Sequence, residues 1–140
     1  MKTKKAVVTA ACASLAAMAA TLAFAADVQG KLKAYQESTE TATRILSGMN
    51  DVQTAKSQAV ALDAALKKHR ADEAALNAEL KKLDLGKQAD GQQMEQASAA
   101  VAKVNEGLAA QQVRVLSKPE LGDVVGKSFS APAGPATKAK

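Results

Sequence analysis

Apolar side chains recur three and then four residues apart through the middle of the chain, a spacing that places them on one face of an α-helix. The longest stripe runs from Val52 to Leu83, and only His69 and Glu73 interrupt it with polar side chains. A stripe of this length is typical of a coiled-coil seam, the line along which one helix packs against another. It predicts a helix over about 52–85, roughly 50 Å long. The leucines expected at its helix–helix interface are Leu62, Leu66, Leu76, Leu80 and Leu83.

A second stripe with the same spacing lies between Met94 and Val115 and predicts a helix over about 91–116. Gly86 is expected to end the preceding helix, because glycine readily adopts the backbone conformation that closes a helix. The short break that follows predicts that the two helices form an antiparallel hairpin. The interface residues expected on this second helix are Val101, Val104 and Leu108.

A third stripe, earlier in the chain, predicts a helix over about 27–47. It is less regular, because the segment 38–43 contains three threonines, which are poor helix-interior residues. The stripe also slips in phase at the segment 47–50, which predicts a turn there. One bent helix over 28–85 is the alternative.

Polar residues precede the two later helices at positions suited to capping. Asn50 with Gln53, and Asp90 with Gln93, have the spacing of a capping box, in which two side chains satisfy free amides at a helix start. They are therefore expected to mark where these helices begin.

The C-terminal segment, 117–140, has a different composition. All three prolines lie in it, and Pro, Gly, Ala, Ser and Lys dominate. This composition predicts a flexible tail, disordered from Ser130 onward. Four apolar residues in the tail have the potential to dock locally: Leu121, Val124, Val125 and Phe129. Overall the pattern predicts an all-α fold, either a three-helix antiparallel bundle over 26–116 or a long helical hairpin, with coiled-coil-like Ala/Leu seams.

The first 25 residues have the organisation of a secretory signal peptide. Three lysines among the first five residues precede an apolar stretch over 6–23, and Ala23 and Ala25 suit signal peptidase. Cleavage is expected before Ala26, with the mature protein in the bacterial periplasm or cell envelope and without a stable membrane span. A retained transmembrane anchor is the alternative.

Composition narrows the candidate chemistry. The only cysteine, Cys12, lies in the predicted signal peptide, so neither a disulfide framework nor a cysteine-based zinc site is expected. Without the three signal-peptide lysines, the formal charge is (19 − 3) − 14 = +2. So small a charge does not favour nucleic acid as a partner. Only Tyr35 and Phe129 are aromatic in the mature chain, which argues against stacking platforms for sugars or bases.

His69 and Glu73 are the only candidates for a metal or haem site, since residues four apart share one helical face. The alternative is a polar layer that fixes helix register. Folding the predicted hairpin places His69 opposite Val104 and Asn105. Met94 then faces a residue of the preceding helix that lies roughly 18 Å along the axis from His69. Because no methionine can then serve as its axial partner, we expect His69 and Glu73 to form a polar layer or an exposed pair, with no cofactor, no metal and no catalytic residue.

The mature chain is poor in large aliphatic side chains, so an isolated bundle would be marginally stable. Self-association or a partner protein would relieve this, which makes a non-enzymatic structural or interaction protein of the cell envelope the leading expectation. A periplasmic binding or chaperone-like module is the alternative, for which Ile45, Leu85 and Val113 are candidate exposed apolar residues. A metal or haem carrier using His69 is a remote alternative.

Overall fold

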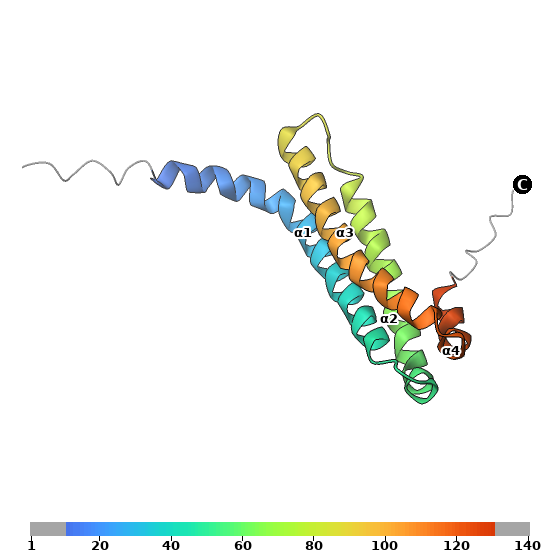
Figure 1. The fold of residues 1–140 in the computed structure, drawn as a ribbon. Helices are drawn as coiled ribbons and strands as arrows, with labels where there is room; N and C mark the ends of the chain where they lie inside the picture. Colours follow the sequence, from blue (N-terminus) through green and yellow to red (C-terminus); the bar gives the residue numbers. More distant parts are fainter. Residues whose placement is uncertain (1–10, 131–140) are drawn as a thin grey trace, which may run out of the picture.

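The computed structural model describes residues 11–130, with side chains from Asp27 onward. Within these residues the chain forms four α-helices and no strand, so the predicted all-α fold is confirmed (Figure 1). The helices are α1 (Ala11–Ser47), α2 (Val52–Leu80), α3 (Gln88–Leu116) and α4 (Pro119–Phe129). The predicted signal peptide with its cleavage site, and the end of the predicted tail over 131–140, lie outside the residues described with side chains.

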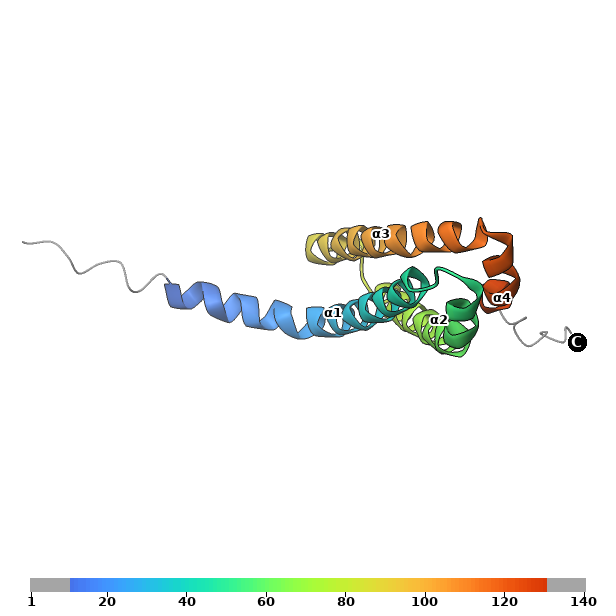
Figure 2. The same ribbon diagram turned by 60° about the horizontal axis from the view of Figure 1, so that its bottom comes forward.

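The first helix is the central element of the bundle. α1 packs along both α2 and α3, whereas α2 and α3 run antiparallel to each other without comparable mutual contact (Figures 1 and 2). α4 folds back at the end of α3 and packs mainly against α2. The predicted hairpin of the two later helices is therefore held together largely through α1. The alternative of one bent helix over 28–85 is wrong, because α1 ends at Ser47 and α2 begins at Val52.

The segment 119–129 corrects the prediction of a flexible tail. Pro119 occupies the first turn of α4, where a helix needs no backbone N–H from that residue. Leu121 and Val125 then lie one turn apart and are fully buried. The tail composition concealed a short amphipathic helix, and the three-helix prediction becomes four helices packed together.

The helix ends differ from the predicted caps by one or more residues. Asp51, rather than Asn50, caps α2: its Oδ1 accepts the Thr54 backbone N–H at 2.8 Å, and Thr54 Oγ1 accepts the Asp51 N–H at 3.2 Å. At the other end α2 stops at Leu80, short of the predicted position 85. Asp90 does not cap α3; its carboxylate accepts the backbone N–H of Asp84 at 2.9 Å and braces the α2–α3 turn instead.

Two apolar clusters fill the interior. The lower core, at the α4 end in Figure 1, takes buried side chains from all four helices. The upper core lies toward the α2–α3 turn and has fewer buried members. The buried residues of the lower core are Ala42, Leu46, Met49, Ala55, Leu62, Ala65, Leu66, Leu108, Val115, Leu121 and Val125. Those of the upper core are Val28, Tyr35, Leu76 and Leu83, with Leu32, Leu80, Met94, Val101 and Val104 half-buried against them.

Candidate functional site

His69 lies half-buried between α1 and α2, close to the junction of the two cores. Its ring centroid is 4.9 Å from that of Tyr35, with the planes tilted by 35°. Its Nδ1 is 3.0 Å from Thr39 Oγ1. The Thr39 hydroxyl donates its only proton to the Tyr35 carbonyl at 2.7 Å, so toward His69 it can act only as an acceptor. The hydrogen-bond pattern therefore places a proton on Nδ1 of His69.

Tyr35 extends this arrangement to the third helix. Its side chain is almost completely buried, and its hydroxyl donates to Asn105 Oδ1 on α3 at 2.6 Å. Burial raises the pKa of Tyr35 above its usual value, so the phenol remains a hydrogen-bond donor. Tyr35, Thr39, His69 and Asn105, which we call the polar layer, thus connect α1, α2 and α3 at one level.

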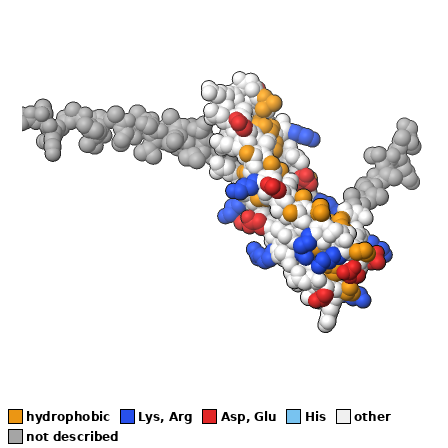
Figure 3. Space-filling model, viewed as in Figure 1, with side chains coloured by type: hydrophobic (Ala, Val, Ile, Leu, Met, Phe, Trp, Pro, Cys, Tyr) orange, Lys and Arg blue, Asp and Glu red, His pale blue; other side chains and the backbone are white. Residues whose placement is uncertain are grey.

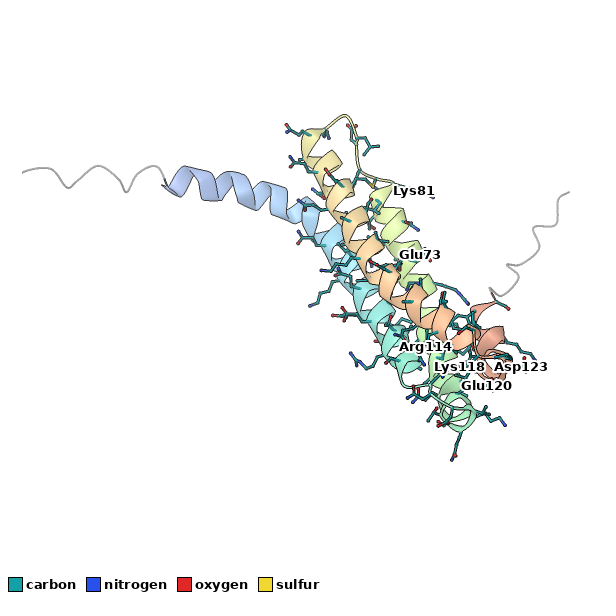
Figure 4. All side chains as sticks on the ribbon, viewed as in Figure 1. Glu73, Lys81, Arg114, Lys118, Glu120 and Asp123 are labelled. Atoms are coloured by element: carbon teal, nitrogen blue, oxygen red, sulfur yellow. The ribbon has the colours of Figure 1, made fainter. Side chains whose placement is uncertain are left out.

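Glu73 does not belong to the polar layer. Glu73, which Figure 4 labels, is exposed on α2 and therefore does not share a buried layer with His69, which is half-buried. Burial lowers the pKa of His69, and the negative charge of Glu73 opposes that effect. In the part of the chain that the structure describes, no three His, Cys, Asp or Glu side chains gather as metal ligands would. The geometry of His69 supports a role in positioning helices.

The expected interface leucines and valines all pack inward, though to different degrees. Leu62, Leu66 and Leu76 on α2, Leu83 in the turn and Leu108 on α3 are buried. The others, Leu80, Val101 and Val104, are half-buried against the upper core. Of the candidate exposed residues, Leu85 and Val113 are 68% and 69% exposed, whereas Ile45 packs against the lower core.

Two arginines have a structural function that the sequence pattern did not indicate. Arg114 on α3 donates through Nη1 and Nη2 to the carbonyls of Met49 and Leu46, at the C-terminus of α1. Arg70 on α2 donates to the carbonyl of Ser128, at the C-terminus of α4, at 2.9 Å. A cation at a helix C-terminus satisfies free carbonyls and opposes the helix dipole. Sequence spacing gave no signal for either contact, because each joins segments more than fifty residues apart.

A groove follows the line of contact between α1 and α3, and three of its lining residues, Val28, Leu32 and Val104, also pack in the upper core. It contains two hollows, of about 410 and 620 Å³, and Gln36 lines both of them. All the lining residues of the two hollows belong to α1 and α3. Amide side chains predominate at one end, and the charged side chains along the groove are Lys33, Glu40, Arg44 and Lys103.

One amide in this groove is not satisfied by the protein. Gln93 Oε1 is buried and has no hydrogen-bond partner among the described residues. The groove is therefore a polar, partly hollow surface between two packed helices.

No family model, curated protein or solved structure matches this chain. None of the helices that the structure describes combines the length and apolarity needed to span a bilayer.

Proposed function

We propose that this chain is an exported, non-enzymatic interaction protein of the bacterial cell envelope, which binds a partner through helix–helix contacts. The observation that supports this is the groove between α1 and α3. Its two hollows follow one another along the helices and are lined by those helices alone. A groove between two parallel ridges of side chains is the surface into which a further helix packs.

The lining of the groove suits a reversible partner better than a permanent apolar one. Gln29, Gln36 and Gln96 present amides that can donate and accept hydrogen bonds. Leu32 and Val104, both half-buried, supply apolar contact area in the two hollows. Partner surfaces with polar groups around a small apolar area are typical of interfaces that form and dissociate.

Export rests on the sequence of the first 25 residues and is tested separately. The intact mass of the protein from the periplasmic fraction should correspond to a chain beginning at Ala26. A mass that includes Met1, or a lipid on Cys12, would contradict the proposed processing.

Site-specific photo-crosslinking in cells tests the proposed groove. A photoreactive amino acid replaces Arg44 on the α1 side of the groove and, as a matched control, Lys67, which is exposed on α2. We expect a discrete crosslinked partner from position 44 and none from position 67. Equal adducts from both positions, or none from position 44, would contradict a groove-bound partner.

A chaperone-like clasp for unfolded chains is the second candidate, favoured by the exposure of Leu85 and Val113. It predicts that the protein suppresses aggregation of a reduced, unfolding client at equimolar concentration. Replacing Leu85 and Val113 by serine should abolish that suppression, and unchanged suppression would exclude these residues as the clasp.

A further inference from the structure

The outer face of α3 carries a row of exposed residues that neither core nor the groove uses. The row alternates in steps of three and four residues, so its members share one side of the helix. Hydrophobic side chains reach the surface along the course of α3 (Figure 3). We call this row the α3 outer stripe, and its members, all exposed, are Ala99, Ala102, Glu106, Ala109, Val113 and Leu116.

The two ends of the α3 outer stripe differ in size. At the C-terminal end two large aliphatic side chains one turn apart, Val113 and Leu116, are 69% and 45% exposed. At the N-terminal end Ala99 and Ala102 leave room above the helix surface. A partner that fits must therefore present small residues to one end and large residues to the other.

We propose that the α3 outer stripe is the interface of a homodimer, in which the α3 helices of two copies pack antiparallel. Reversing the direction of α3 places its large end over the small end of the other copy. Leu116 then faces Ala99 of the second copy, and Val113 faces Ala102 of the second copy. These are the small-against-large layers that pack most closely in antiparallel helix pairs. A twofold axis repeats each contact, as a closed dimer requires.

The positions beside the stripe are compatible with this pairing. In the same register Lys103 lies near Ala110 of the second copy, and Asn105 lies near Gln112 of the second copy, so no like charges meet there. The stripe itself contains one unfavourable element, Glu106. The two copies of Glu106 lie near the twofold axis, about 4.5 Å apart along the helix direction by helix rise, and their charges repel.

This inference rests on the proposed function, in that it names one partner for helix contacts, but it uses a different surface of α3. The two fail separately. A monomer that still crosslinks a partner through position 44 would refute the dimer alone, and a dimer without that crosslink would refute the groove alone.

Sedimentation velocity over a range of concentrations tests the dimer, using protein purified from cells that express the full chain. We expect a reversible monomer–dimer equilibrium. Val113→Glu should weaken it by at least about tenfold, because it places a charge in an apolar layer. Val60→Glu is the matched control, since Val60 is 82% exposed on α2, away from α3, and it should leave the equilibrium unchanged.

Glu106→Ala provides a test in the opposite direction. Removing the paired carboxylates should strengthen the dimer by about tenfold, a gain that general damage to the fold would not produce. Circular dichroism checks that each variant remains helical. A monomer at all concentrations, or equal weakening by Val60→Glu and Val113→Glu, would overturn the proposal.

Cysteine crosslinking determines the register, in a Cys12→Ser background that contains no other cysteine. Mixing the Ala102→Cys and Val113→Cys proteins should give a disulfide-linked heterodimer, since these positions face each other. Val113→Cys alone should not crosslink, because its two copies would be separated by about 16 Å along the axis. Efficient self-crosslinking at position 113, or no crosslink in the mixture, would refute the antiparallel pairing.

Discussion

The lower and upper cores are built from helices with the same three-four spacing but reach different degrees of burial. In the lower core α3 contributes the buried Leu108 and Val115, and α4 covers the assembly with Leu121 and Val125. In the upper core the α3 residues Met94, Val101 and Val104 are only half-buried, and among the described helices α4 packs on the lower core instead. A regular stripe thus determines which face of a helix packs, whereas the number of neighbouring helices determines how deeply it is buried.

Among the changes considered, removal of α4 should lower the free energy of unfolding most, because α4 covers only the lower core. A chain that ends at Lys118 loses Leu121 and Val125 and uncovers their neighbours in the lower core. We expect the free energy of unfolding to fall by more than about 3 kcal/mol, as for the loss of two fully buried aliphatic side chains. Urea denaturation measures it, with a chain that ends at Ser130 as the control that keeps α4. Equal stability of the two shortened chains would show that α4 does not support the lower core.

Matched leucine truncations compare the two cores on one helix. Leu62 is fully buried in the lower core, and Leu80 is half-buried in the upper core. We expect Leu62→Ala to cost about 3 kcal/mol, within the range for buried leucines. Leu80→Ala should cost less than about 1.5 kcal/mol, in proportion to the smaller area it buries. Chemical unfolding of both variants measures the loss in free energy of unfolding. Equal losses would show that the two cores do not differ in the way proposed.

Loss of an arginine contact should destabilise mainly the lower end of the bundle, where α1 ends. Arg114→Met keeps much of the aliphatic volume but removes the donors to the Leu46 and Met49 carbonyls. The expected cost is about 1.5–2 kcal/mol, typical of hydrogen bonds from a charged group. Lys103→Met on the same helix is the control and should be nearly neutral. Amide hydrogen exchange at the end of α1 should accelerate in Arg114→Met alone.

His69 should give the smallest effect, a dependence of stability on pH. Burial lowers its pKa in the folded protein, so the unfolded chain binds a proton more readily. The stability that neutral His69 provides is complete above its ordinary pKa of 6.5 and is lost as the pH falls through the lower folded-state pKa. His69 is the only histidine, so His69→Asn should flatten the melting temperature between pH 7.5 and 5.5. An identical slope in the variant would assign the dependence to other groups.

The three longer helices were predictable because each presents one apolar stripe to its neighbours. The slip in phase near Ser47 also located the first turn. The break after Leu85 located the second turn only approximately, because α2 ends at Leu80 and α3 begins at Gln88. α4 was obscured by the prolines and glycines around it. The spacing of Leu121, Val125 and Phe129, with Pro119 just before them, was nevertheless a signal for a short helix.

The polar layer was only partly predictable. The sequence identified His69 as a polar interruption and placed Asn105 at its level, but in the structure Tyr35 from α1 lies between them. Its contact with Asn105 spans seventy positions, and it depends on α1 packing against both later helices. Which helix occupies the middle of a bundle is decided by three-dimensional packing, and stripes of similar character do not encode it.

The central position of α1 has a consequence for the order of folding. α2 and α3 touch each other little, so their hairpin has few contacts that would stabilise it before α1 is in place. α1 and α2 are joined by a short turn and share an extensive interface, and such local contacts form early because closing a short loop costs little entropy. During synthesis the residues of this pair are made before those of α3 and α4. The later helices then dock onto a surface that already exists, which makes the N-terminal half the template for the C-terminal half.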